Sequence, residues 1–349
     1  MFKQYQVYYT KGEKGKNKKL PGYLVAVERN LIPSMECWWF LAIFYLCAWR
    51  AVGLEEECPH PEDSYPCYCE EDEERTTMHC NYLQDNKQIR DGLGRLTDHK
   101  LGQVSIWMFD TGVIKSDAFK GPQINEIVFS HSTVNMESPP FLGQENSLSR
   151  LTFLSCFDEE DLVGSYSLGH LNKLKEVTFE KNDIKELKND WITSAGPILR
   201  SVTFDNCRIE KLEDKVFSKL TSLTTIFLMD NKISSISRSM FPMPAENLRS
   251  ISMNDNNIES LPDDIFKNMP SLRTIELERN KIKKISQEAW GNIIEDLSRV
   301  YLEDNPIRCD KDLKWISKKD LPKTFTGACS EPAKLRNKSL RVLTPADFH

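Results

Sequence analysis

The chain has 349 residues, of which 40% are hydrophobic, with 46 basic and 52 acidic side chains and a formal net charge of −6. Residues 1–53 hold eight Lys or Arg and three Asp or Glu, so their removal would take the charge to −11. This balance argues against nucleic acid or an anionic membrane as the main partner, because both attract positive charge.

The first 53 residues are typical of a targeting sequence. Residues 37–49 carry no charge, and as a helix they would span about 20 Å, less than the roughly 30 Å hydrocarbon core of a membrane. We expect residues 1–34 to be a basic polar leader and residues 35–53 a signal peptide, cleaved before Leu54. Two alternatives stay open: Met35 is the true start, or the segment is a retained signal anchor.

Four cysteines follow within 23 residues, at positions 58, 67, 69 and 80. They lie close to ten acidic residues between Glu55 and Glu74, so a metal site is the rival interpretation. Carboxylates do not strengthen the preference of thiolates for zinc, and a secretion signal upstream favours disulfides. We expect an N-terminal cysteine cap over residues 54–100, with no metal. Four cysteines allow three connectivities, and spacing alone does not choose among them.

A sequence frame then recurs through the chain. Leu174-x-x-Val177-x-Phe179-x-x-Asn182-x-Ile184 is repeated at intervals of 24 or 25 residues, and its leading leucines are Leu174, Leu199, Leu223, Leu248, Leu272 and Leu297. Upstream, the frames that start at Leu148 and Ile124 also fit, whereas the register between Leu101 and Phe119 is ambiguous by about two residues. This frame and period resemble a leucine-rich repeat, and about eight repeats are expected over residues 101–304.

Alternation within each frame predicts a short strand with one buried face. We expect an α/β solenoid, a leucine-rich repeat horseshoe, with a parallel sheet on the concave face, an irregular or short helical convex face, and disulfide caps. In most repeats an Asn follows the strand where the backbone bends, and its amide can form hydrogen bonds with peptide groups that the strands leave unpaired. In two repeats Cys156 and Cys207 replace this Asn. These two would be buried free thiols about 10 Å apart. Recurring aromatics should plug the convex side, namely Phe217, Phe241, Phe266 and Trp290.

Stacked strands would align the polar positions into columns across the concave face. The central column is Val128, Thr152, Thr178, Thr203, Phe227, Ser252, Glu276 and Tyr301. The outer column is Ser130, Leu154, Glu180, Asp205, Met229, Asn254, Glu278 and Glu303. A basic entrance ladder precedes the strands, formed by Lys175, Arg200, Arg249 and Arg273. The simpler interpretation is that the charged residues of these columns and of the ladder only keep the surface soluble. The sharper one predicts partner binding, and its candidate residues are Phe227, Met229, Tyr301, Glu276, Thr203 and Thr178.

The C-terminal residues 305–349 are expected to form a second cap. Asn305-Pro306-Ile307-Arg308-Cys309, then Leu313-Lys314-Trp315 and Cys329, resemble the C-terminal cap of extracellular leucine-rich repeat proteins. The first cysteine cluster resembles the N-terminal cap of the same proteins. That resemblance implies the pairs Cys58–Cys69 and Cys67–Cys80. Two cysteines that the family usually has in the C-terminal cap are missing here, which leaves one pair, Cys309–Cys329.

A closer resemblance rests on the acidic Cys-Pro start, the Trp- and Phe-rich early repeats and the YLEDNPI…CDKDLKWI junction. These features are similar to arthropod homologues of the non-catalytic subunit of oplophorus-luciferin 2-monooxygenase. The subunit in question lacks the active site, so the resemblance implies a partner role without catalysis. Asn337-Lys338-Ser339 is the one glycosylation sequon, and we expect glycosylation at Asn337.

Catalytic patterns are not evident in this sequence. The six histidines show no metal-ligand spacing, and there is neither a nucleophile elbow nor a phosphate loop. A pair of His131 and Cys156 is conceivable, but Cys156 should point into the core. We therefore expect a non-enzymatic secreted protein without a cofactor that recognises another extracellular protein. The alternatives are a membrane-tethered adhesion receptor, held in the plasma membrane by residues 37–49, and a structural component of the extracellular matrix.

Overall fold

The computed structural model describes residues 57–73, 75–110, 112–157, 166–194 and 198–348. The chain divides into two units, residues 1–52 and 53–349. The expected leader, the signal segment and the cleavage point before Leu54 all lie outside the described residues. Among the residues that are described, no helix is both long enough and apolar enough to cross a membrane.

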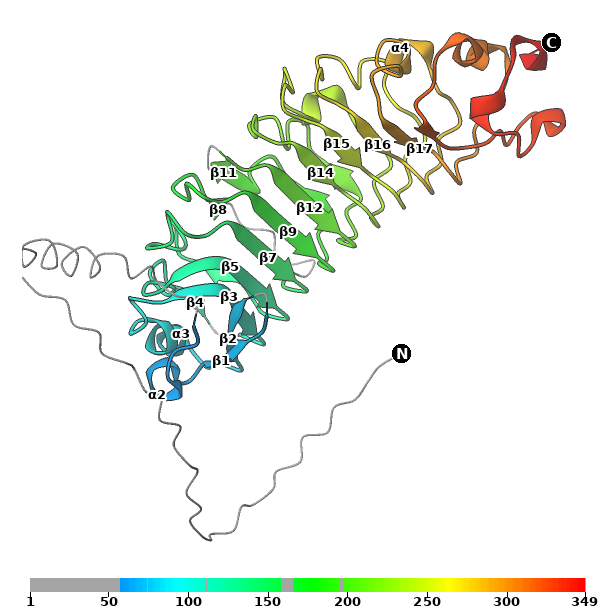
Figure 1. Cartoon of the computed structure of the whole chain (residues 1–349). Coiled ribbons are helices and arrows are strands. Elements are labelled where there is room, and N and C mark those ends of the chain that lie inside the picture. The colour runs from blue at the N-terminus through cyan, green and yellow to red at the C-terminus, as the bar shows by residue number, and fades with distance from the viewer. Residues whose placement is uncertain (1–56, 74, 111, 158–165, 195–197, 349) are drawn as a thin grey trace, which may run out of the picture. The chain divides into compact units, whose positions relative to one another are not determined.

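One long sheet runs through the described part of the second unit (Figure 1). Its strands, in spatial order, are β1 (Tyr68–Glu71), β2 (Thr76–Asn81), β3 (Lys100–Trp107), β5 (Gln123–Ser130), β7 (Arg150–Leu154), β9 (Glu176–Glu180), β12 (Ser201–Asp205), β14 (Thr225–Phe227), β15 (Ser250–Ser252), β16 (Thr274–Glu276), β17 (Arg299–Tyr301) and β18 (Thr324–Phe325). Strand β1 is antiparallel to β2, and every later neighbour is parallel. The order follows the chain, as a solenoid requires.

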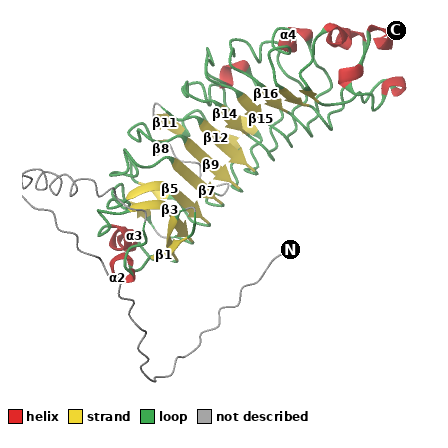
Figure 2. Cartoon of the chain, viewed as in Figure 1, coloured by secondary structure: helices red, strands yellow, loops and turns green. Residues whose placement is uncertain are grey.

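The segments that return between these strands hold little regular structure (Figure 2). Three short parallel pairs join neighbouring returns: β4 (Val113–Ile114) with β6 (Asn135–Met136), β8 (Tyr166–Ser167) with β11 (Ile192–Ser194), and β10 (Glu186–Leu187) with β13 (Lys211–Leu212). The α-helices are α2 (Pro61–Ser64), α3 (Asn86–Leu93) and α4 (Gln287–Trp290). The 3-10 helices are η1 (Arg238–Met240), η2 (Lys311–Lys318), η3 (Ala333–Leu335), η4 (Leu340–Val342) and η5 (Pro345–Phe348).

A continuous apolar core fills the coils. In the middle repeats it is built from phenylalanines of equivalent register: the ring centroids of Phe153 and Phe179 are 5.0 Å apart and those of Phe179 and Phe204 are 4.7 Å apart, both stacked. Trp191 meets the last two rings edge-on. Such pairs contribute about 0.5–1.5 kcal/mol beyond their buried area. From Leu228 onward, aliphatic side chains and methionine take over this position. The four predicted convex plugs, Phe217, Phe241, Phe266 and Trp290, are all buried.

The ambiguous first repeat is resolved by its pairing. Val104 aligns with Ile127 and Ile106 with Phe129, so these two residues of β3 point into the core. Met108, which continues the same alternation, is 43% exposed because the chain has already turned away from the strand. Local periodicity could not distinguish the last core residue from the first residue of the turn.

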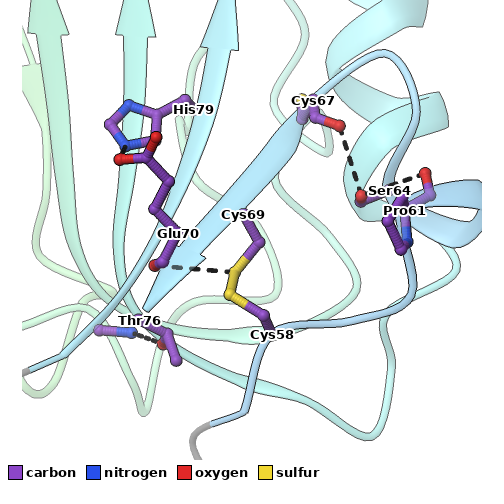
Figure 3. The surroundings of a disulfide bond; sticks show 9 residues. Cys58, Pro61, Ser64, Cys67, Cys69, Glu70, Thr76 and His79 are labelled. Carbon is purple, nitrogen blue, oxygen red and sulfur yellow. Dashed lines mark hydrogen bonds and ion pairs between the residues drawn. A yellow bond between two sulfur atoms is a disulfide. The ribbon is translucent and has the colours of Figure 1, made fainter. Parts of the chain in front are cut away.

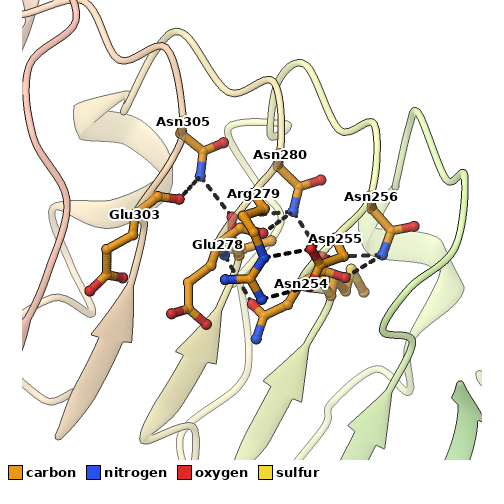
Figure 4. Close-up of polar contacts among 10 residues, drawn as sticks. Asn254, Asp255, Asn256, Glu278, Arg279, Asn280, Glu303 and Asn305 are labelled. Carbon is orange, nitrogen blue, oxygen red and sulfur yellow. Dashed lines mark hydrogen bonds and ion pairs between the residues drawn. The ribbon is translucent and has the colours of Figure 1, made fainter.

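Asparagine side chains bridge adjacent coils just after the strands, as predicted. The Oδ1 atom of Asn231 accepts from the backbone N–H groups of Cys207 and Ile209 at 3.1 and 3.0 Å, and its Nδ2 donates to the carbonyls of Phe204 and Met229. Figure 4 shows the same arrangement at Asn256, Asn280 and Asn305. Each buried amide therefore satisfies backbone groups that the sheet leaves unpaired.

One residue per coil has a left-handed backbone where the strand ends. We name this set the turn column, and its members are Tyr82, Met108, His131, Ser155, Lys181, Asn206, Asp230, Asp255, Arg279 and Asp304, with φ between 49° and 56°. Such a backbone is uncommon for bulky side chains. For every member except Asp304, the N–H donates to a carbonyl of the next coil, for example Lys181 to the Asp205 carbonyl at 2.9 Å, and this bond holds the conformation.

Candidate functional site

Parallel pairing assembles the central column in the predicted register. Thr178 lies beside Thr203, Thr203 beside Phe227, and Glu276 beside Tyr301. Thr152 and Val128 extend the column on one side, and it continues through Ser105 to His79 of the N-terminal cysteine-rich segment. All six sequence-predicted partner-binding residues therefore lie on one face of the sheet, and five of them lie in a single row.

Phe227 and Met229 are less exposed than the sequence analysis expected. Both are half-buried, and they lie two residues apart at the end of β14. Ser252, their neighbour on β15, was expected to be exposed and is instead fully buried, with no hydrogen-bond partner for its hydroxyl among the described residues. It is a small side chain between the larger Phe227 and Glu276 of the two adjacent strands.

Carboxylates crowd the outer column on both sides of Met229. Burial raises the pKa of Asp205 above its usual range, and the nearby charges of Asp230 and Glu180 raise it further. The pKa of Glu278 is also raised, first by burial and then by Glu303. Beyond burial, the contributions of neighbouring carboxylates to both shifts show that negative side chains gather at this edge.

Some of the negative charge is compensated in the turn column. Arg279 clamps Asp255 of the previous coil with two hydrogen bonds, at 2.5 and 2.7 Å (Figure 4). Lys181 is 2.7 Å from Glu180. Since Arg279 and Lys181 are exposed, these pairs stabilise the fold only weakly, and a partner can exchange with them. Among the described residues of this edge, Glu180 and Asp255 therefore have an ion-pair partner, whereas Asp205 and Asp230 have none.

Exposed aromatic side chains gather at the opposite, N-terminal end of the same face, where the sequence analysis placed no site. Tyr68 and Tyr82 are 48% and 58% exposed. Tyr68 stacks on His79, and Tyr82 meets Trp107 edge-on at 4.8 Å. The sequence could have placed Trp107 in the outer column, because Trp107 aligns with Ser130 of that column. This alignment could not be used because the register between Leu101 and Phe119 was ambiguous.

The disulfides are the pairs that the family resemblance implies. Cys58 is bonded to Cys69 and Cys67 to Cys80, with Cα–Cα distances of 5.6 and 4.4 Å. Figure 3 shows the first of these bonds beside Glu70, whose carboxylate lies 3.6 Å from the ring of His79.

A third bond, Cys309–Cys329, closes the C-terminal segment. Asn337 of the sequon is exposed in that segment, and its glycosylation stays a prediction.

Cys156 and Cys207 are buried free thiols, as predicted. Burial raises the pKa of Cys156 to about 11 and that of Cys207 to about 12. Both thiols are therefore protonated at neutral pH, and a protonated thiol is a poor nucleophile and metal ligand. The Nδ1 atom of His131 is 2.9 Å from the Ser130 hydroxyl. His131 and Cys156 share the wall of an open cavity of about 580 Å³ at the turn column, but the raised thiol pKa argues against a catalytic pair.

Comparison with known proteins agrees with this geometry. A family model described as leucine rich repeat matches residues 197–245 and 246–307, and a model of the BspA type leucine rich repeat region matches residues 109–208. No curated protein sequence matches the chain significantly.

Among solved structures, the crystal structure of a TLR13–ssRNA13 complex superposes with a TM-score of 0.51 at 16% identity, over 66% of this chain. The match spans 32% of the TLR13 chain, so this protein corresponds to about a third of that length, and the likeness concerns the fold alone. Together, the coiled parallel sheet, the asparagine bridges and the two family models establish that this chain is a leucine-rich repeat protein with disulfide-bonded cysteines.

Proposed function

We propose that this chain is a non-enzymatic extracellular protein that recognises another protein through its concave face. The observation that carries the proposal is the row of Thr178, Thr203, Phe227, Glu276 and Tyr301, which parallel pairing brings together from five coils. Phe227 and Met229 supply the apolar centre, and polar residues surround them. This is the usual anatomy of a binding hot spot, in which a few large side chains sit within a polar rim.

The partner surface should be basic. Burial first, and then neighbouring carboxylates, raise the pKa values of Asp205, beside Asp230 and Glu180, and of Glu278, beside Glu303. Lysine or arginine side chains of a partner would relieve the repulsion between these carboxylates, which would steer association and fix orientation.

Three disulfides favour an oxidising compartment, which supports the extracellular placement. The resemblance to the non-catalytic subunit of oplophorus-luciferin 2-monooxygenase favours a role as a partner subunit. A membrane-tethered receptor and a matrix component are the competing versions of the same binding function.

The test is capture of a protein partner from the native extracellular fluid with wild-type protein and a Phe227→Ser/Met229→Ser variant. We expect the variant to be secreted normally and to lose capture, because it removes the apolar centre. Met243→Ser/Val342→Ser is the matched control, since both of its positions are 59% exposed. Equal capture by wild type and the Phe227/Met229 variant would reject the concave site. N-terminal sequencing of the secreted protein separates the versions, because a start at Leu54 excludes the tether.

A further inference from the structure

The entrance ladder lies at the other margin of the sheet, away from the acidic outer column. Arg200 directly precedes β12, Thr224 precedes β14 and Arg249 precedes β15, at the strand ends opposite the arrowheads in Figure 1. Backbone hydrogen bonds hold them in line: the N–H of Thr224 donates to the Arg200 carbonyl, and the N–H of Arg249 donates to the Thr224 carbonyl, each at 2.8 Å. Equivalent backbone hydrogen bonds extend the entrance ladder to Lys175 at one end and to Arg273 at the other.

A cavity of about 280 Å³ opens in this ladder where the short, neutral Thr224 stands between two arginines. Its walls carry hydrogen-bonding side chains only from Arg200, Arg249, Ser222, Thr224, Asn247 and Ser271. No carboxylate of the described residues lines it. The strand spacing of about 4.8 Å places the two arginine Cα atoms roughly 10 Å apart, so both side chains can reach one group seated over Thr224.

Among the described residues, Arg200 and Arg249 differ from Arg150 in having no counter-charge, and from Arg273 in having no side-chain hydrogen bond to a carbonyl. Arg150 is the first residue of β7, one position further along its strand than the ladder residues, and it is paired with Glu126 at 3.3 Å. Arg273 directs its guanidinium to the carbonyls of Pro270 and Leu272. Within the described residues, neither Arg200 nor Arg249 makes an ion pair, and both are exposed. Two free guanidinium groups at a polar notch are suited to a tetrahedral oxyanion, which they can bind through paired N–H donors.

We propose that this notch binds the sulfate group of a sulfated polysaccharide that lies along the entrance ladder. A linear chain fits because Lys175, Arg200, Arg249 and Arg273 form a row roughly 19 Å long across five strands. An extracellular setting favours the sulfate of a polysaccharide over the phosphate of nucleic acid, and the notch between Arg200 and Arg249 is the part of the row that would hold one sulfate group. The inference rests on the extracellular placement of the proposed function but uses a different surface from the protein-binding row.

The test measures binding of a sulfated heparin oligosaccharide by calorimetry at 0.15 M salt, with full-length Arg200→Gln/Arg249→Gln protein compared with wild type. We expect Kd to rise by about ten- to a hundredfold, since hydrogen bonds to charged groups are strong. Lys87→Gln/Arg95→Gln is the matched control, because it removes two exposed bases of the N-terminal segment that make no ion pair with a described residue, and it should leave Kd within about twofold. Arg200→Lys/Arg249→Lys keeps the charge but loses the planar fork, and should also weaken binding.

Several outcomes would overturn the inference. These are absence of binding by wild type, unchanged binding by the Arg200/Arg249 Gln variant, or an equal loss in the Lys87/Arg95 control. A single-stranded RNA oligonucleotide of equal charge that binds more tightly, with the same dependence on both arginines, would reassign the notch to phosphate. Circular dichroism of each variant checks the fold. Loss of protein capture by the Phe227/Met229 variant is scored separately, so the two proposals can fail independently.

Discussion

The substitution Asn280→Ala tests the claim that buried amides hold adjacent coils together. Asn280 is 6% exposed. Its Oδ1 atom accepts from the Ile258 N–H at 3.0 Å, and its Nδ2 donates to the carbonyl oxygens of Met253, Leu277 and Glu278 at 2.8, 3.2 and 3.2 Å. Alanine removes all four bonds at once.

The backbone groups that lose Asn280 differ in whether they keep another hydrogen-bond partner. The Leu277 carbonyl still accepts from Asn305, and the Glu278 carbonyl from the Asp255 N–H, whereas the Ile258 N–H has no other acceptor among the described residues. One unsatisfied buried donor costs about 1–3 kcal/mol, and each lost bond to a carbonyl that keeps another donor costs less. The free energy of unfolding should therefore fall by about 2–5 kcal/mol.

Urea-induced unfolding of the disulfide-intact protein, followed by circular dichroism at pH 7, measures this loss. The midpoint should fall while the dependence on urea stays constant, since the exposed surface is unchanged. Asn292→Ala makes the same change at an exposed turn and should shift stability by less than about 0.5 kcal/mol. A loss below about 1 kcal/mol for Asn280→Ala would refute the reasoning, as would equal losses at both positions.

Three further predictions concern the caps, the thiols and the acidic edge. Replacing Cys309 and Cys329 by serine removes a crosslink over a separation of 20 residues and should lower stability by about 3 kcal/mol in urea unfolding; an unchanged urea midpoint would contradict this. Cys156 and Cys207 should resist a thiol reagent at pH 8 in native protein and react fully in guanidinium; rapid native labelling would contradict their burial. Burial and neighbouring carboxylates raise the folded-state pKa of Glu278, so its ionisation destabilises the fold as the pH rises above the pKa of an ordinary glutamate. Glu278→Gln should therefore raise Tm at pH 7 but not at pH 3. An equal shift in Tm at both pH values would exclude the electrostatic cause.

Much of the solenoid could be predicted from the sequence, because the pattern that sets each strand and turn lies within a single repeat. The residue spacing predicted which side chains of Leu272-x-x-Ile275-x-Leu277 face inward, and these three are buried. It also predicted that the Asn280 amide would satisfy backbone groups at the bend, since a bent backbone leaves groups unpaired wherever it occurs, and the structure adds that these groups belong partly to the adjacent coil. Alternation failed at Met108, where strand and turn have the same local pattern, and at Ser252, which was expected to be exposed and is buried.

What the sequence determined is therefore the repeat: its period, its inward residues and the single file of coils, because these depend on neighbours a few residues apart. Only the tertiary structure decided how exposed each surface residue is. Ser252 is buried because Phe227 and Glu276 arrive from adjacent coils, and Arg200 and Arg249 face one notch because Thr224 stands between them. Those contacts join residues about 25 positions apart, so their geometry exists only once the coils have stacked.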